Sequence, residues 1–225
     1  MTVPALEPRF IAVEGCIGAG KTSLVNLLGN QFDAQMVREM DEENPFIGKF
    51  YQDRETFGFQ TQIFFLLSRY QQYLKLAQRD LFNSVVIIDY LFQRDRVFAH
   101  LNLKGHESQL YDQIFNLIND KVPQPDLVIF LQADTDVLLA RVEKRGREYE
   151  AFINREYLDE VNKAFNNFFF YYAETPLLVI NTNEIDFVEK KCDLEKLINK
   201  INSFCCSNSQ SIHTGINFYM NFNFR

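Results

Sequence analysis

The segment from Gly15 to Ser23 has the glycine, lysine and hydroxyl spacing of a loop that binds nucleotide phosphates. It completes the pattern GxxxxGK[ST] and reads Gly15, Cys16, Ile17, Gly18, Ala19, Gly20, Lys21, Thr22 and Ser23. Glycines let backbone N–H groups face a triphosphate, the lysine reaches the outer phosphates, and the threonine hydroxyl can bind Mg²⁺. An apolar run precedes the loop and an amphipathic stretch follows it, as this motif requires. The segment therefore predicts a site for ATP or GTP with Mg²⁺.

Two acidic residues end apolar runs. Asp89 follows the run 85–88, the position at which phosphate-loop enzymes hold Mg²⁺, so Thr22 and Asp89 are the predicted metal residues. Glu39 ends the run 35–39. The acidic residues after it leave open an alternative in which Glu39 is plain surface charge, but its place at a strand end favours a functional role.

Three arginines around a glycine form a second candidate phosphate site: Arg141, Arg145 and Arg147. Such arginines can close over a phosphoryl group during transfer and neutralise the charge on its oxygens. An equally good interpretation is a basic helix C-terminus that Gly146 caps. The residues themselves do not decide between the two.

Five β-rich runs alternate with longer helical stretches: 10–14, 35–39, 84–89, 126–132 and 177–181. This alternation predicts an α/β domain with a parallel sheet flanked by helices, whose ligands bind at the carboxyl ends of the strands. The stretch 55–78 is almost continuously apolar, which is typical of a buried helix. Its polar exceptions, Gln62 and Arg69, fall on one face of that helix and need a partner or a ligand.

Composition narrows the class of partner. The chain has 225 residues, is 47% hydrophobic and carries a net charge of −7 without a basic cluster, which argues against nucleic acid and favours a small-molecule acceptor. No run has the pattern of a signal peptide or a membrane span, so we expect a cytoplasmic protein that binds no membrane. The four cysteines suggest neither a disulfide framework nor a zinc site.

The sequence predicts one domain over residues 1–202 and a disordered tail over residues 203–225, where periodicity is lost. The aromatic alternation near the end of the tail leaves open an edge strand or a subunit contact.

From Phe10 to Asp193 the chain resembles the deoxyribonucleoside kinases, in particular the branch that acts on deoxyadenosine, deoxyguanosine and deoxycytidine. Arg38-Glu39 followed by Glu43-Asn44-Pro45-Phe46 is one landmark, and the phosphate loop, the acid of strand 84–89 and the arginine-rich segment follow the family order. The resemblance implies a P-loop NTPase fold with a five-stranded parallel sheet and an arginine-rich lid. It also implies a homodimer that transfers phosphate from ATP, with Mg²⁺, to a deoxynucleoside 5′-hydroxyl.

The resemblance also assigns roles to individual residues. Glu39 matches the general base, and Lys21, Asp89, Arg141, Arg145 and Arg147 complete the catalytic set. Tyr51 and Glu150 match the pair at the sugar 3′-hydroxyl, which refuses a 2′-hydroxyl. Gln62, Arg69 and Asp95 match the residues that read the base.

The chain departs from the family after Asp89, where Tyr90 replaces an arginine. A tyrosine hydroxyl supplies no fixed positive charge near the transferring phosphate. Arg94, Arg96 and Arg38 are the candidates to supply that charge.

A second departure is Thr61, which stands where many relatives place an aromatic residue beside the base. Stacking then falls to Phe98, Phe59 or Phe65, of which Phe98 is the predicted substrate-binding residue.

Hydrogen-bonding patterns predict activity on deoxyadenosine, deoxyguanosine or deoxycytidine in preference to thymidine, because Gln62 and the acceptor Asp95 suit bases that donate hydrogens. Two alternatives stay open. A nucleoside monophosphate kinase would need further cations for the acceptor phosphate, and a non-catalytic nucleotide-binding regulatory module is compatible with Tyr90.

Overall fold

A parallel sheet of six strands runs through the computed structural model, which describes residues 9–39, 43–77, 85–212 and 219–222, the last part from residue 206 as backbone only. The spatial order is β2-β3-β1-β4-β5-β6, and neighbouring strands are parallel. The strands are β1 (Phe10–Gly15), β2 (Gln35–Val37), β3 (Val86–Ile88), β4 (Leu127–Gln132), β5 (Leu177–Asn181) and β6 (Tyr219–Phe222).

The central strands are apolar on both faces because helices cover both faces of a parallel sheet. Every residue of β1 and β3 is buried, and Ile11 of β1 lies opposite Ile87 of β3 and Leu127 of β4. The chain places β2 and β3 on one side of β1 and the later strands on the other. This reversal opens a crevice at the carboxyl ends of β1 and β3, where the phosphate loop and Asp89 lie.

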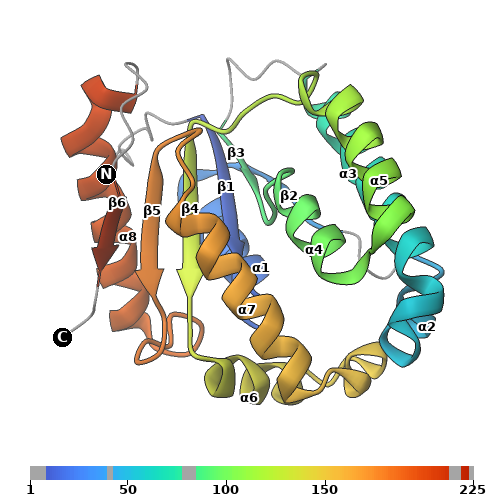
Figure 1. The fold of residues 1–225 in the computed structure, drawn as a ribbon. Helices are drawn as coiled ribbons and strands as arrows, with labels where there is room; N and C mark the ends of the chain where they lie inside the picture. The colour runs from blue at the N-terminus through green and yellow to red at the C-terminus, as the bar shows by residue number, and fades with distance from the viewer. Residues whose placement is uncertain (1–8, 40–42, 78–84, 213–218, 223–225) are drawn as a thin grey trace.

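Helices cover the two faces of the sheet (Figure 1). In that view α7 crosses the near face, α1 lies on the far face, and α2 to α5 are grouped beside β2 and β3. The helices are α1 (Lys21–Phe32), α2 (Ile47–Gln52), α3 (Arg54–Ala77), α4 (Arg94–Asn102), α5 (Gly105–Asn119), α6 (Thr135–Arg145), the 3₁₀ helix η2 (Glu148–Phe152), α7 (Arg155–Phe170) and α8 (Lys191–Ile212).

The five expected strands and the helix predicted over 55–78 are confirmed as β1 to β5 and α3. The C-terminal part differs from the expectation of a domain that ends at residue 202 and a tail without structure. There α8 continues to Ile212, and β6 pairs with β5 as a sixth strand, because β5 would otherwise end the sheet with an unpaired row of backbone groups. No helix within the described residues is both long and apolar enough to span a membrane.

Helix α7 packs against the sheet through the face on which its apolar residues recur with the helical period. Asn154 caps its first turn by accepting a hydrogen bond from the backbone N–H of Tyr157 at 2.8 Å. Phe165 and Phe169 fall on one face and are buried, and the ring of Phe169 stacks on Phe130 of β4 with centroids 4.1 Å apart. Phe170, the next residue, is 69% exposed.

These neighbours provide a matched test of the core. Phe169→Ala should lower the free energy of unfolding by about 3–5 kcal/mol, because it removes a buried ring and leaves a cavity beneath α7. Phe170→Ala should change it by no more than about 0.5 kcal/mol, as is usual for exposed side chains. Urea denaturation followed by circular dichroism measures both values. Equal losses in the two variants would contradict this packing.

Candidate active site

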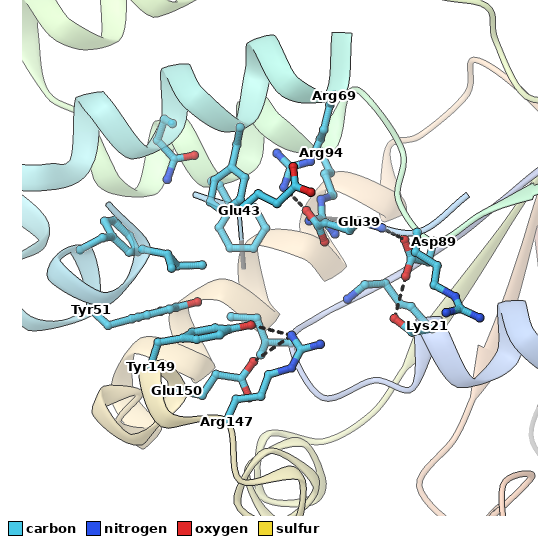
Figure 2. Close-up of a pocket in the computed structure, with 18 of the residues that line it drawn as sticks. Lys21, Glu39, Glu43, Tyr51, Arg69, Asp89, Arg94, Arg147, Tyr149 and Glu150 are labelled. Atoms are coloured by element: carbon cyan, nitrogen blue, oxygen red, sulfur yellow. Dashed lines mark hydrogen bonds and ion pairs between the residues drawn. The ribbon is translucent and has the colours of Figure 1, made fainter. Parts of the chain in front are cut away.

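One pocket of about 420 Å³ gathers most of the predicted site residues at the carboxyl ends of the strands (Figure 2). Its wall includes the phosphate loop, the segment after β2, helices α2, α3 and α4, and the lid segment after α6. The lining residues are Ile17, Lys21, Thr22, Arg38, Glu39, Glu43, Ile47, Phe50, Tyr51, Gln62, Phe65, Arg69, Asp89, Arg94, Phe98, Arg145, Arg147, Tyr149, Glu150 and Tyr157.

The phosphate loop has the backbone that its glycines predict. Gly18 and Gly20 adopt φ values of 83° and 98°, which L side chains rarely adopt. A Cβ at Gly18 would also lie 2.6 Å from the carbonyl oxygen of Leu138, so glycine lets the loop touch α6. Lys21 donates hydrogen bonds from Nζ to the carbonyl oxygens of Gly15 at 2.9 Å and Cys16 at 3.2 Å, which holds the ammonium group over the loop.

Asp89 connects the phosphate loop to Glu39. Its Oδ2 accepts a hydrogen bond from Thr22 Oγ1 at 2.7 Å, and its Oδ1 accepts one from the backbone N–H of Glu39 at 2.6 Å. Burial raises the pKa of the Asp89 carboxyl, and the charge of Glu39 adds to this effect, while the bond from Thr22 opposes it. The pair fits Mg²⁺, because a hydroxyl that donates to a carboxylate still has lone pairs to offer a cation.

Glu39 is shared between two arginines. Its Oε1 accepts hydrogen bonds from Arg69 on α3 and Arg94 on α4, and all three side chains are nearly buried. Burial alone would raise the pKa of Glu39, but the charges of Arg69, Arg94 and Lys21 outweigh it and hold the pKa well below its usual range. Glu39 is therefore a carboxylate throughout the physiological pH range.

Two further carboxylates hold those arginines from behind. Asp95 binds Arg69, and Glu14 Oε1 accepts from Arg94 Nη1 at 3.3 Å. Asp95 lies behind Arg69, not on the pocket wall, so it orients the arginine instead of facing the cavity. Burial raises the pKa of Asp95 to about 6, against the opposing charges of Arg69 and Arg94.

Among the three candidates to replace the absent arginine, Arg94 is the one that contacts Glu39. Tyr90 points into the core, where its hydroxyl donates to Gln72 on α3. Arg96 binds Asp112 outside the pocket at 3.3 Å. Arg38 lines the pocket but donates to Asn26 of α1 at 3.0 Å.

The far end of the pocket carries groups suited to a base. Gln62 and Arg69 face it from α3, as the helical spacing predicts. Phe65 and Phe98 line it and can stack on a base. Thr61 is buried and does not line the pocket, and Phe59 packs against the core. The guanidinium of Arg69 lies over the ring of Phe65 at 4.6 Å, which fixes its orientation.

The lid arginines are already engaged by protein groups. Arg145 makes a two-pronged contact with Glu150, with distances of 3.0 Å from Nε to Oε2 and 2.5 Å from Nη2 to Oε1. Arg147 donates to the hydroxyl of Tyr149 at 2.7 Å. Arg141, the third predicted clamp, lies outside the pocket wall and donates to the carbonyl oxygen of Thr182 at 2.7 Å, near the end of β5.

Sequence reasoning gave no site role to several residues here: Glu43, Ile47, Phe50, Tyr149 and Tyr157 of the pocket wall, and Glu14 behind Arg94. Tyr149 and Tyr157 line the pocket, but aromatic residues are so frequent in this chain that neither stands out. Glu14 could have been predicted to have a buried partner, because it is an acidic residue in an otherwise apolar strand that leads into the phosphate loop.

Comparisons with known proteins agree with this geometry. The family model "Deoxynucleoside kinase" matches residues 11–206. A deoxyguanosine kinase of Bacillus subtilis (strain 168) is 35% identical over 199 residues, which are 84% of this chain and 93% of that protein. A deoxyadenosine/deoxycytidine kinase of the same organism is 27% identical over 211 residues, or 89% of this chain and 95% of that protein.

A solved structure is similar as well. The deoxyadenosine kinase of M. mycoides with bound dATP superimposes with a TM-score of 0.75 at 27% identity, covering 85% of this chain and 98% of that chain. The phosphate loop, the strand-end acids and the lid thus occur together in a fold that this family shares. The chain belongs to the deoxynucleoside kinase family.

Proposed function

We propose that this protein transfers the γ-phosphate of ATP to the 5′-hydroxyl of a deoxyribonucleoside. The observation that carries the proposal is that Lys21 and Thr22, which suit a triphosphate, line the same pocket as Gln62 and Arg69, which suit a base. Glu39 lies between Lys21 and Arg69 (Figure 2). The phosphate donor and the nucleoside that accepts the phosphate can therefore meet at the carboxylate of Glu39.

Glu39 is the proposed general base. Within the described residues both arginines bind Oε1, so we assign to Oε2 the proton of the 5′-hydroxyl. A strongly ionised carboxylate suits this task, because the transition state of phosphoryl transfer is loose and needs little proton removal before the bond to phosphorus forms. Lys21 and the two lid arginines that line the pocket, Arg145 and Arg147, would stabilise the charge on the transferred group.

We include Mg²⁺ in the proposal, and Thr22 and Asp89 are the residues that would hold it. When bound, it would neutralise charge on the β- and γ-phosphate oxygens. A cytoplasmic location also belongs to the proposal, supported by cysteines without a disulfide framework. So does a homodimer, supported by the family resemblance and by the exposed Leu110 and Leu117, which share one face of α5.

A monophosphate acceptor is the main alternative. It would need surplus positive charge at the acceptor end, but Arg69 and Arg94 both bind Glu39, and Arg145 binds Glu150. A panel of ADP release and product chromatography, over the four deoxynucleosides, their ribonucleosides and their monophosphates, tests the proposal. Deoxynucleoside-dependent ADP release with equal formation of monophosphate supports it, and nucleotide binding without such release favours a regulatory module.

The role of Glu39 as general base is tested by removing its negative charge. Glu39→Gln keeps the shape and an oxygen acceptor but removes the base, so turnover should fall by roughly two to four orders of magnitude while the Kd for the nucleoside changes little. Steady-state kinetics and calorimetry measure the two quantities, with the exposed Glu107→Gln as a control. A loss of turnover below threefold would remove Glu39 from this role.

The role of Arg94 is tested by replacing its guanidinium with an uncharged side chain. Arg94→Met should lower turnover about a hundredfold, since a charge aimed at the reacting centre is lost. It should also move the acid limb of kcat/KM to higher pH, because the pKa of Glu39 rises when one of the cations that lowers it is removed. Arg94→Lys should recover part of the rate.

Arg96→Met, in the same helix but outside the pocket, should leave both quantities near those of the wild type. Tyr90→Arg should be neutral or harmful, because a second cation would be forced into a buried aromatic site. A large gain in turnover from Tyr90→Arg, or a pH profile unchanged in Arg94→Met, would show that Arg94 does not fill the place of the absent arginine.

Selectivity for the base is tested by comparing thymidine with the other deoxynucleosides. Thymidine should be the poorest of the four deoxynucleosides, because both terminal nitrogens of Arg69 already bind carboxylates, Glu39 and Asp95, so that thymine O4 would be left without a donor. An unpaired buried acceptor costs about 1–3 kcal/mol. Replacing Arg69 by Met together with Asp95 by Ala should raise the ratio of thymidine activity to that of the best substrate. Total turnover should fall in this variant, because Glu39 loses a partner.

Competition assays with pairs of deoxynucleosides measure that ratio directly. Wild-type protein that phosphorylates thymidine as well as its best purine or cytosine substrate would refute this view of the pocket.

A further inference from the structure

Tyr149 connects two parts of the pocket that come from distant segments of the chain. It belongs to η2, directly after the lid arginines, and its ring stacks on that of Tyr51 in α2 with centroids 6.3 Å apart and planes 12° from parallel. Figure 2 shows the two rings lying along one another on the side of the cavity opposite Arg69. Tyr51 is held in turn by edge contacts with Phe50 and Tyr157.

The hydroxyl of Tyr149 faces the lid. It accepts a hydrogen bond from Arg147 Nη1 at 2.7 Å, and that same nitrogen lies 3.8 Å from Glu150 Oε1. Tyr149 is therefore in contact with the sugar end of the pocket through its ring and with a phosphate-binding arginine through its oxygen. Glu150, the other sugar-side group, is buried beside it and binds Arg145.

We infer that Tyr149 is a positioning residue that couples occupation of the sugar site to the placement of Arg147. This inference rests on the proposed function. A nucleoside seated against Tyr51 and Glu150 would fix the ring of Tyr149, and the fixed ring would aim Arg147 across the pocket toward Lys21. The phosphate clamp is then complete only when an acceptor is present, which limits transfer of phosphate to water.

Binding measurements test the coupling without turnover. The Kd of deoxyadenosine and of deoxyguanosine is measured by calorimetry with and without a non-hydrolysable ATP analogue and Mg²⁺. In the wild type the analogue should tighten the better-bound nucleoside by about 5- to 150-fold, the usual range for coupled sites. Tyr149→Phe keeps the stack but loses the hydroxyl that accepts a hydrogen bond from Arg147. In this variant, nucleoside binding alone should stay within about twofold and the coupling factor should fall below about 2.

Tyr149→Ala should lose the coupling as well and should also weaken the binding of nucleoside alone, because the stack on Tyr51 is gone. Tyr149→Phe should release more ADP per nucleoside phosphorylated than the wild type. Tyr171→Phe is the matched control, since Tyr171 is 74% exposed at the end of α7.

Wild-type coupling in Tyr149→Phe, or a wild type that phosphorylates deoxynucleosides without any coupling, would overturn the inference. A wild type that binds both ligands but forms no monophosphate would overturn the proposed function instead. The two failures are distinguishable because one is measured by binding and the other by product.

Discussion

Glu39 shared between Arg69 and Arg94 is the interaction on which the rest of the site depends. With Asp95 behind one arginine and Glu14 behind the other, five buried charges alternate in sign. Charges removed from water are costly unless each has a partner, and here every arginine has two. The series joins β1, the segment after β2, α3 and α4. The cost of burying these charges is therefore offset only when all four segments are correctly folded against one another.

This arrangement also explains how a carboxylate at the centre of a phosphate-transfer site stays ionised. Burial would favour the protonated form, and the arginines and Lys21 reverse that preference. The backbone N–H of Glu39 is fixed by Asp89, which is in turn bound by Thr22 of the phosphate loop. The phosphate loop and Glu39 with its two arginines therefore belong to one continuous network.

The fold protects that network by placing it where the strand order reverses. The carboxyl ends of β1 and β3 carry the phosphate loop and Asp89, and α3 and α4 supply the two arginines from one side. The lid approaches from the other side, where Glu150 binds Arg145 and the hydroxyl of Tyr149 accepts a hydrogen bond from Arg147. The similarity to deoxynucleoside kinases extends over this whole assembly, not over the phosphate loop alone.

The sequence by itself determined the fold class and the phosphate loop, because hydrophobic alternation and a motif with fixed spacing are local properties. It also placed Gln62 and Arg69 on one helical face, since the helical period sets that relation. It did not determine which strand forms the edge of the sheet beyond β5. The aromatic alternation near the C-terminus was compatible with a tail or with a strand, and in the structure it forms β6, which pairs with β5.

Only the tertiary structure could choose among Arg94, Arg96 and Arg38. All three lie close to site residues in the sequence, but the direction in which each side chain leaves its helix or segment decides which residue it contacts. Arg94 contacts Glu39, Arg96 contacts Asp112 and Arg38 contacts Asn26. For the same reason the sequence did not identify Tyr149 as a pocket residue. Its position in the pocket is defined by stacking on Tyr51, which lies on another helix. Contacts between distant segments are fixed by packing, and a single sequence carries no local trace of them.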